Sequence, residues 1–463
     1  MADAATPQAS ALAQPQFWTL DRVADALGGG PRGATPLTRI ATDTRAVGPG
    51  DCFVALKGES FDAHDFLTQA VSQGAAAVIV ADARRAAGLG VPVYAVADTL
   101  VALGQLGRFR RRAWSKPVVG VVGTNGKTST KELLRAALGG ALEVHATVGN
   151  YNNLVGVPLT LFAMPDHADV AVIEMGTNQP GEVATLRAIV EPDIVVVTSI
   201  AEEHLEGLGD LAGVLREEVS ACDGVALAVV PAVQPEIGEA ARGRARRVVS
   251  AGLDDGDLHA TSWGIDPDGQ GWFVLEDVTV RVPLRGVHNL RNAMLALAVA
   301  RESGVSVADA ARGIAGMPSP PMRVNFEEHG SATVINDAYN SNPGSARVAL
   351  ELLEHAGTGR QRVAVLGTML ELGATADQLH DAVARAALAA PLDLVVGVGA
   401  FADALQRVSP GDARAVGGAD PDAAWDAVRS RLASNAVILL KGSRGVRLER
   451  LLPRIAEWAA TPR

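Results

Sequence analysis

Short apolar runs alternate with longer amphipathic stretches through the middle of the chain. The runs VVGVVG, DVAVIEMG, DIVVVTSI and GVALAVV begin at residues 118, 169, 193 and 224. Continuous apolar runs of this length are typical of strands buried on both faces, and their alternation with helices predicts a parallel sheet. Residues 290–304 predict a long helix ended by glycine, and residues 270–283 predict an antiparallel hairpin.

The same alternation of predicted strands and helices continues on both sides of this central stretch. Residues 17–29 and 64–74 predict helices, and residues 51–58 and 76–81 predict strands. Further along, strands are expected at 332–339, 362–367, 392–399 and 436–443, with alanine-rich helices between them. The whole chain therefore belongs to the α/β class.

Two interruptions divide the pattern into three parts. An arginine-rich stretch ends at Pro117, and the proline-rich segment MPSPPMR covers Met317–Arg323. We expect a flexible tail at 1–16, which has neither the basic start nor the apolar run of a signal peptide. Three domains are expected at 17–115, 116–317 and 318–463, the last of them Rossmann-like.

Composition and charge narrow the functional classes. The 463 residues carry a formal net charge of -11, which argues against nucleic acid as a partner. No apolar run reaches about 18 residues, so no membrane span is expected. Cys52 and Cys222 are the only cysteines and lack a metal-binding spacing, so we expect reduced thiols and a cytoplasmic protein.

The segment Val118–Thr130 carries the clearest chemical signal. An apolar run leads into GTNGKTST, whose two glycines let backbone N–H groups approach anionic oxygens at a helix N-terminus. In such a loop the lysine reaches the outer phosphates and the next hydroxyl binds magnesium. The candidate phosphate-binding residues are Gly123, Thr124, Asn125, Gly126, Lys127, Thr128 and Ser129. A glycine-rich turn that binds no ligand is the alternative.

Two polar side chains follow the next apolar runs. Glu174 ends an apolar run, where an uncompensated carboxylate would be costly, so a magnesium ligand explains it well. A structural glutamate in a salt bridge is the alternative. His204 follows the next run and suits a metal or a phosphate, although a lone histidine is equally compatible with a structural role.

Polar groups also gather at a predicted helix start, in GVHNLRNAM. His288, Asn289 and Asn292 lie close together there and suit the edge and face of an adenine. Asn289 could instead be a simple N-cap.

In the last part of the chain, Asp337 ends a strand and suits a ribose hydroxyl. Arg323, Lys441 and Arg444 could meet phosphates or carboxylates. Taken one at a time, their segments are also compatible with an ordinary turn and loop.

The order of these motifs resembles the Mur ligase family over residues 18–458. The carrying motifs are GTNGKTS, VIEMG, IAEEHLEG, HNLRNA and DAYNSNP. The resemblance implies a cytoplasmic, ATP-dependent enzyme that forms an amide bond in the peptidoglycan precursor. It also implies a central ATPase domain between an N-terminal UDP-binding domain and a C-terminal ligase domain.

Within the family, the chain is most similar to members that add D-alanyl-D-alanine to UDP-N-acetylmuramoyl-tripeptide. Residues 43–66 and 148–161 carry this similarity, and the DNPR sequence of diaminopimelate-adding relatives is absent. The implied reaction uses ATP and Mg²⁺, passes through an acyl phosphate and releases ADP and phosphate. Its partners are small-molecule substrates, and we expect a monomer.

The resemblance also implies roles for particular residues. Lys127, Glu174 and His204 would be catalytic, and Thr128, Glu174 and His204 would organise the metal. His288, Asn292, Arg323 and Asp337 would join the phosphate loop in binding ATP. The residues expected near the UDP-sugar and peptide are Thr42, Asp43, Thr44, Arg45, Asn150, Asn152, Asn153, Asn340, Lys441, Ser443 and Arg444.

Three positions depart from the family pattern. Val121 replaces the leading glycine of the phosphate loop, and Thr368 stands where relatives commonly have an aspartate. Many relatives also carry a carbamylated lysine shortly after the histidine, whereas this chain has no lysine between Lys131 and Lys441. We hypothesise that Glu217 or Glu218 supplies that charge, with Glu218 favoured by spacing; a solvated helix face is the alternative.

Other functions stay open at this stage. Another Mur-type or folylpolyglutamate-type ligase would use the same chemistry with a different amine. A P-loop switch would hydrolyse ATP without any amine, and an inactive scaffold would only bind nucleotide. The sequence leaves the third residue of the peptide undetermined.

Overall fold

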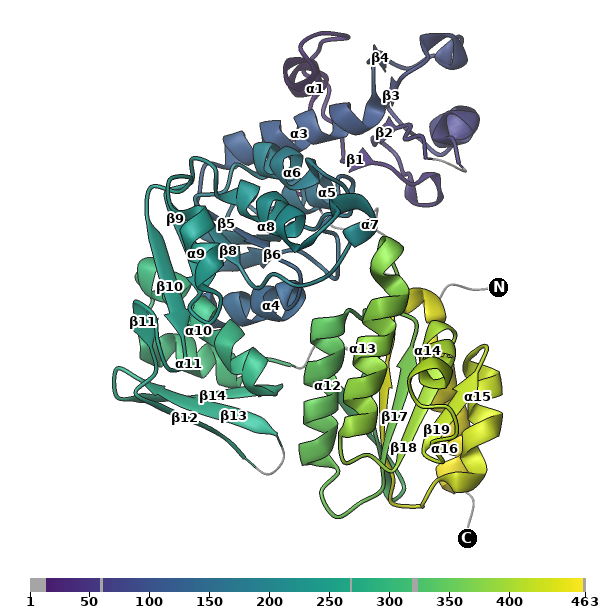
Figure 1. Cartoon of the computed structure of the whole chain (residues 1–463). Coiled ribbons are helices and arrows are strands. Elements are labelled where there is room, and N and C mark those ends of the chain that lie inside the picture. Colours follow the sequence, from purple (N-terminus) through teal and green to yellow (C-terminus); the bar gives the residue numbers. More distant parts are fainter. Residues whose placement is uncertain (1–13, 59–60, 267–268, 319–323, 461–463) are drawn as a thin grey trace.

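The chain forms four β-sheets, which follow one another along the sequence (Figure 1). The computed structural model describes residues 14–58, 61–266, 269–318 and 324–460. Within those residues, no helix is long and apolar enough to cross a membrane. Most of the predicted tail and Arg323 lie outside the described residues, and the bounds of the three domains stay predictions.

The N-terminal sheet contains four short parallel strands in the order β1-β2-β3-β4. They are β1 (Ile40–Ala41), β2 (Cys52–Val54), β3 (Ala77–Val80) and β4 (Val93–Ala95), with helices α1 (Leu20–Leu27), α2 (Leu67–Ser72) and α3 (Thr99–Trp114). The helix predicted at 17–29 is confirmed, and it ends at Gly28 in the left-handed region (φ 76°). Helix α3 packs against α5 (Gly156–Phe162) and α6 (Glu182–Val190) of the central part, because Gly104 and Gly107 allow close contact with Ile189 and Pro158.

The central sheet has seven parallel strands in the order β11-β10-β9-β8-β5-β7-β6. Their bounds are β5 (Val118–Val122), β6 (Val144–Ala146), β7 (Val170–Glu174), β8 (Ile194–Val197), β9 (Leu227–Pro231), β10 (Val248–Gly252) and β11 (Leu258–His259). All four strands predicted from apolar runs are confirmed. The chain leaves β5 for one side of the sheet and later returns to the other, so β5 lies at the switch point where such sheets bind ligands.

Helices cover both faces of this sheet. They are α4 (Lys127–Leu138), α5 (Gly156–Phe162), α6 (Glu182–Val190), α7 (Leu205–Leu208), α8 (Leu211–Val219), α9 (Pro235–Ala241), α10 (Val287–Glu302) and α11 (Val307–Ala315). Helices α4 and α10 pack on one face around Leu133, Leu134 and Met294, and α6 and α8 pack on the other around Leu186 and Val214.

An antiparallel sheet of β12 (Ser262–Ile265), β13 (Gln270–Leu275) and β14 (Val278–Arg285) precedes α10. This confirms the predicted hairpin. Strand β14 ends beside the cavity described below, and Gly286 (φ 90°) turns the chain into α10.

The C-terminal sheet has the order β15-β16-β20-β17-β18-β19. Its strands are β15 (Asn325–His329), β16 (Ala332–Asp337), β17 (Arg362–Gly367), β18 (Leu394–Val398), β19 (Ala415–Gly418) and β20 (Val437–Lys441). The surrounding helices are α12 (Pro343–Ala356), α13 (Ala376–Ala389), α14 (Ala400–Val408), α15 (Pro421–Val428) and α16 (Leu451–Ala460). Only β15 runs antiparallel to its neighbour, so this sheet is mixed rather than wholly parallel.

Candidate active site

A cavity of about 770 Å³ lies where the carboxyl ends of the central strands face the C-terminal sheet. Its size is in the range typical of small-molecule sites. Among the residues predicted from the sequence, it is lined by Thr124, Asn125, Gly126, Lys127, Thr128, Ser129, Asn150, Asn152, Asn153, Glu174, His204, His288, Asp337, Asn340, Lys441, Ser443 and Arg444. Residues far apart in the chain thus meet at one place.

The phosphate loop connects β5 to α4, and both of its glycines are needed for its shape. Gly123 and Gly126 have φ angles of 118° and 83°. A Cβ atom on Gly123 would lie 2.4 Å from the Thr198 hydroxyl oxygen, and one on Gly126 would lie 2.9 Å from the Asn292 amide nitrogen. A larger residue would therefore be strained and would displace its neighbours.

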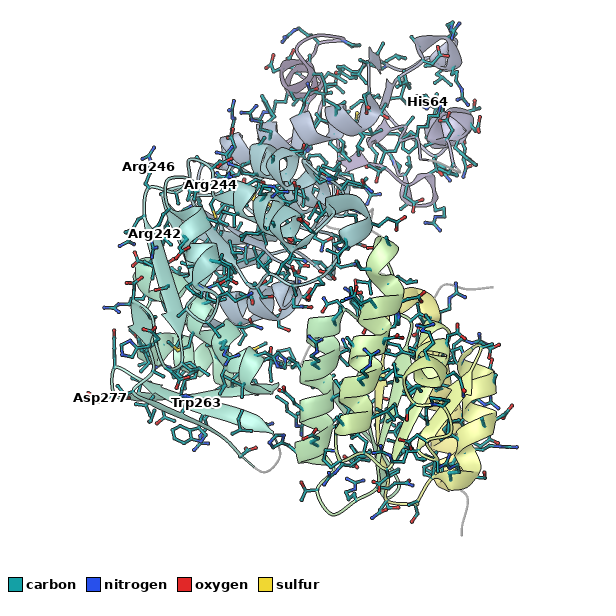
Figure 2. The ribbon with its side chains drawn as sticks, viewed as in Figure 1. His64, Arg242, Arg244, Arg246, Trp263 and Asp277 are labelled. Atoms are coloured by element: carbon teal, nitrogen blue, oxygen red, sulfur yellow. The ribbon has the colours of Figure 1, made fainter. Side chains whose placement is uncertain are left out.

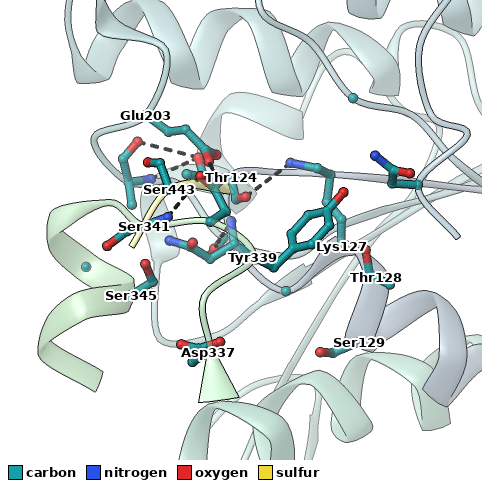
Figure 3. Close-up of a pocket in the computed structure, with 18 of the residues that line it drawn as sticks. Thr124, Lys127, Thr128, Ser129, Glu203, Asp337, Tyr339, Ser341, Ser345 and Ser443 are labelled. Atoms are coloured by element: carbon teal, nitrogen blue, oxygen red, sulfur yellow. Dashed lines mark hydrogen bonds between the residues drawn. The ribbon is translucent and has the colours of Figure 1, made fainter. Parts of the chain in front are cut away.

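The first half of this loop is held by the protein itself. The backbone N–H of Gly123 donates to Glu218 Oε2 (2.8 Å), that of Thr124 to the Ser199 carbonyl (2.8 Å), and that of Asn125 to Ser199 Oγ (3.1 Å). Lys127 Nζ donates to the carbonyls of Gly123 and Thr124, the latter at 3.1 Å (Figure 3). The N–H groups of the first turn of α4 have no partner within the helix and face the cavity end of the loop.

Glu174 ends β7 as a buried carboxylate, with only 1% of its surface exposed. Its Oε1 accepts hydrogen bonds from Thr128 Oγ1 (3.2 Å) and Asn152 Nδ2 (2.9 Å). No described residue donates to its Oε2, and Lys131 Nζ lies 3.9 Å from that oxygen. Lys131 is fully buried and also donates to the carbonyl of Gly149 (2.9 Å). This geometry is compatible both with a structural glutamate in a salt bridge and with a magnesium ligand.

His204 lies at the start of α7 in the left-handed region (φ 53°) and contacts the C-terminal part of the chain. Its Nδ1 hydrogen-bonds Glu371 Oε2, while its Nε2 is 3.9 Å from Glu203 Oε2. The Glu206 N–H donates to the Glu371 carbonyl (3.3 Å). Glu371 therefore fixes the orientation of the ring and leaves Nε2 on the cavity side.

Glu217 and Glu218 on α8 are both buried, which is incompatible with a solvated helix face. Glu217 accepts from the N–H groups of Gly181 (2.8 Å) and Val183 (2.9 Å) and thus stabilises the start of α6. Glu218 points instead to the phosphate loop through Gly123. Burial raises the pKa of Glu218, and the charge of Lys127 opposes this effect.

A less polar part of the cavity lies between β14 and α12, lined by Pro283, Leu284, Val348, Ala349 and Leu352 together with His288. Burial lowers the pKa of His288 to about 4, so this ring is neutral at pH 7. Asn289 lines the same wall, whereas Asn292 packs behind Gly126 and donates to Asn289 Oδ1 (3.3 Å). The structure therefore does not bring Asn292 to the cavity surface.

The C-terminal wall is held by an ion pair between buried Lys441 and partly exposed Asp337. Lys441 Nζ lies 2.8 Å from Asp337 Oδ2 and donates to the Asn340 carbonyl (2.6 Å). Ser443 Oγ accepts from the Leu370 N–H (3.0 Å), and the Arg444 guanidinium lies 5.6 Å from the centre of the Tyr339 ring. Thr368 does not line the cavity; its hydroxyl accepts from the Ala400 N–H (3.0 Å) at the start of α14.

Some predicted residues lie elsewhere. Thr42, Asp43, Thr44 and Arg45 belong to the N-terminal part of the chain, in which Figure 2 labels His64, and they do not line this cavity. The Arg45 guanidinium binds the Asp43 carboxylate (2.7 Å) and lowers the pKa of Asp43. Gly123 lies behind the cavity surface.

Several residues of this site are not predicted from the sequence. Lys131, Asn342 and Glu371 were assigned no role, although Asn342 and Asn125 exchange two hydrogen bonds (2.8 and 3.2 Å). The rarity of lysine could have drawn attention to Lys131. No sequence signal pairs His204 with Glu371, because the contact joins positions 167 residues apart.

Comparison with known proteins identifies related chains. "Mur ligase family, catalytic domain" matches residues 36–111, "Mur ligase middle domain" matches 121–300, and "Mur ligase, glutamate ligase domain" matches 322–444. The UDP-N-acetylmuramoyl-tripeptide–D-alanyl-D-alanine ligase of Escherichia coli (strain K12) is 35% identical over 460 residues, covering 95% of this chain and 98% of that protein.

Solved structures agree with this similarity. A crystal structure of MurF from Acinetobacter baumannii superposes with a TM-score of 0.87 at 32% identity, covering 96% of this chain and 100% of that one. MurF ligase from Thermotoga maritima, solved in complex with ADP, gives a TM-score of 0.79 at 27% identity over 91% of this chain and 97% of that one.

Proposed function

The chain belongs to the Mur ligase family, and we propose that it is an ATP-dependent ligase that joins D-alanyl-D-alanine to UDP-N-acetylmuramoyl-tripeptide. The observation that carries the proposal is a shared cavity in which the phosphate loop, Glu174 and His204 face the C-terminal wall. Such a cavity can hold a nucleotide and an acid together. The full-length similarity to ligases with this substrate pair supports the choice of amine.

ATP occupies the part of the cavity between the phosphate loop and β14. Its phosphates meet the first-turn N–H groups of α4 and Lys127, because the amides of Gly123, Thr124 and Asn125 already donate within the protein. The adenine lies against Leu284 and Leu352 beside neutral His288 and Asn289, and Asp337 meets the ribose. Arg323, which lies outside the described residues, is kept as a candidate phosphate ligand on resemblance alone.

The oxygen atoms of Glu174 and Thr128 are suitable ligands for Mg²⁺. A buried carboxylate oxygen without a hydrogen-bond donor lies next to the Thr128 hydroxyl, and hard cations prefer such oxygen ligands together with substrate phosphates. Glu174 and Thr128 would hold the ion, with His204 as a further candidate. Among the described residues no group of three or more His, Cys, Asp or Glu is arranged around one metal position. When bound, the ion supplies positive charge to the phosphates.

The reaction activates a carboxylate. The C-terminal carboxylate of the tripeptide attacks the terminal phosphorus of ATP, ADP leaves, and an acyl phosphate forms. The neutral amine then attacks the acyl carbon, the nitrogen releases a proton to solvent, and phosphate leaves with the bond electrons. Lys127 and the α4 amides stabilise the charge on the transferred group, and contact with the C-terminal domain excludes water from the acyl phosphate.

Glu218 supplies the negative charge that relatives obtain from a carbamylated lysine. Two observations support this assignment over Glu217. Glu218 accepts a hydrogen bond from the Gly123 N–H of the phosphate loop, and the charge of Lys127 opposes the effect of burial, which raises the pKa of Glu218. Glu217 instead caps α6. We expect Glu218→Gln to weaken the dependence of the rate on Mg²⁺ concentration, and Glu217→Gln to lower stability alone.

The UDP-sugar is assigned to the N-terminal part, through Thr42, Asp43, Thr44 and Arg45. The peptide it carries would reach the cavity past Asn150, Asn152 and Asn153, which line it. We expect the protein to act as a monomer. Because the reaction consumes ATP, we assign it to the cytoplasm.

The test is product formation from defined substrates. The protein is incubated with ATP, Mg²⁺, UDP-N-acetylmuramoyl-tripeptide and D-alanyl-D-alanine, and the pentapeptide is sought by mass. Parallel reactions replace the dipeptide with D-alanine, diaminopimelate or glutamate. We expect phosphate release and product with the dipeptide alone; product with a single amino acid instead, or ATP hydrolysis that ignores the amine, would contradict the proposal.

A further inference from the structure

Two buried side chains, each with an oxygen atom that is unpaired within the described part of the chain, line the cavity from opposite domains. Glu203 follows β8 and is 7% exposed, and Ser341 follows β16 and is 3% exposed. Glu203 Oε1 accepts a hydrogen bond from Asn340 Nδ2. Neither Glu203 Oε2 nor Ser341 Oγ has a hydrogen-bond partner among the described residues, although both side chains line the cavity (Figure 3).

A buried carboxylate oxygen of this kind is costly unless a cation or a donor reaches it. The nearby cationic groups of the chain are engaged elsewhere. Lys127 donates to two carbonyls of the phosphate loop, and Lys441 pairs with Asp337. His204 turns its Nδ1 to Glu371, and its Nε2 stays 3.9 Å from Glu203, beyond hydrogen-bond distance. Arg444 lies against the Tyr339 ring, and Mg²⁺ is assigned to Glu174 and Thr128. This leaves a cation from a substrate as the partner of Glu203.

We propose that Glu203 and Ser341 bind the ammonium group of the incoming amine, which rests on the proposed function because that reaction requires such a substrate. The amino group of a peptide has a pKa of about 8, so it enters mainly as an ammonium with three N–H donors. A carboxylate oxygen and a hydroxyl oxygen, both free to accept, match two of those donors.

The position of this subsite suits the chemistry. In Figure 3, Glu203, Ser341 and Ser443 lie on one side of Lys127, whereas Thr128 and Ser129 lie on the other. The amine would therefore approach an acyl phosphate at Lys127 from the side away from the first turn of α4. Since Glu203 and Ser341 belong to different domains, the subsite is complete only when the two domains are in contact.

The test separates amine binding from carboxylate activation. Hydroxylamine, a small neutral nucleophile, traps the acyl phosphate as a hydroxamate without an ammonium group to anchor. Glu203→Gln keeps the shape and the bond from Asn340 but removes the charge, and Ser341→Ala removes the hydroxyl. Glu202→Gln, one residue earlier in the same loop, is the matched control.

We expect Glu203→Gln to raise the KM for the amine about 10- to 100-fold, the usual range for losing one charge-assisted hydrogen bond. Ser341→Ala should raise it less, and Glu202→Gln should leave it unchanged. Hydroxamate formation and the KM values for ATP and UDP-tripeptide should stay within about twofold of the parent in all three variants.

Two results would overturn the subsite: an unchanged KM for the amine in Glu203→Gln, or an equal fall in hydroxamate formation, which would assign Glu203 to phosphoryl transfer beside His204. The proposed function fails by a different result. In that case the parent itself makes no hydroxamate from UDP-tripeptide and ATP.

Discussion

At the residue scale, Lys131 shows how a buried charge prepares the site. It is fully buried, and its Nζ lies 3.1 Å from Glu132 and 3.9 Å from Glu174. It also bonds the Gly149 carbonyl next to Asn150. One side chain thus connects α4, the candidate metal ligand and the loop expected to meet the peptide.

Removing this charge should destabilise the protein through Glu174. We expect Lys131→Met to lower the free energy of unfolding by about 3–5 kcal/mol, because it leaves buried Glu174 without a nearby cation. Mg²⁺ with ADP should recover more stability in the variant than in the parent, as measured by thermal unfolding. Lys57→Met, at an exposed lysine, is the control and should change stability by less than about 0.5 kcal/mol. If Lys131→Met and the parent had the same free energy of unfolding, this role of Lys131 would be refuted.

His288 predicts a pH effect on stability. Its folded pKa of about 4 lies below the ordinary value of 6.5, so the unfolded chain takes up a proton first as the pH falls. The stabilising contribution is fully present above pH 6.5 and is lost between pH 6.5 and 4, up to about 3 kcal/mol. Chemical unfolding should be measured at pH 7 and at pH 4. The free energy of unfolding should fall less between these two pH values in His288→Gln than in the parent. Identical losses would mean that the ring is not held neutral.

At the element scale, the sequence predicts the central strands that carry the site better than it predicts the strands at the edges of the sheets. Strands β5, β7 and β8 are buried apolar runs, and their ends place the phosphate loop, Glu174 and His204. Strand β15 reads NFEEH and is half-exposed at an edge, so it has no apolar run to reveal it. The motif residues were predictable because local patterns carry them. Glu371 was not, because its contact with His204 depends on how two domains pack.

The turn before α4 provides a matched test of the phosphate loop. Gly126 and Gly181 both precede helices with nearly the same backbone angles, φ 83° and ψ 0° against φ 85° and ψ -4°. A Cβ atom on Gly126 would meet Asn292 at 2.9 Å, whereas one on Gly181 would meet nothing within 4 Å. Both alanine variants should lose about 1 kcal/mol of stability from the left-handed conformation.

Only Gly126→Ala should also weaken nucleotide binding, by tenfold or more, because it displaces the loop that faces the phosphates. Calorimetric titration with ADP and Mg²⁺ measures this. If Gly181→Ala weakened binding equally, strain in general rather than this turn would be responsible.

At the scale of the whole molecule, the C-terminal domain contacts the central one through polar pairs. These are Asn125 with Asn342, Glu203 with Asn340, and His204 with Glu371. Each of these hydrogen bonds contributes only modestly to the free energy of domain contact. Substrates can therefore shift the equilibrium between open and closed arrangements of the two domains. The cavity and the amine subsite both depend on this contact.

Loss of one pair should open the unliganded enzyme. We expect Glu371→Ala to increase the radius of gyration in small-angle scattering without substrates, and ATP with UDP-tripeptide to reverse the increase. Glu351→Ala, at an exposed glutamate on α12, should scatter like the parent. Identical curves for Glu371→Ala and parent would show that this contact does not hold the domains together.

The central claim is that the cavity transfers a phosphoryl group to a carboxylate. Its most direct test uses UDP-tripeptide labelled with ¹⁸O in the C-terminal carboxylate, in a reaction with ATP, Mg²⁺ and D-alanyl-D-alanine. The account predicts that the released phosphate carries one ¹⁸O atom from the carboxylate. Phosphate without the label, released at the rate of product formation, would contradict it.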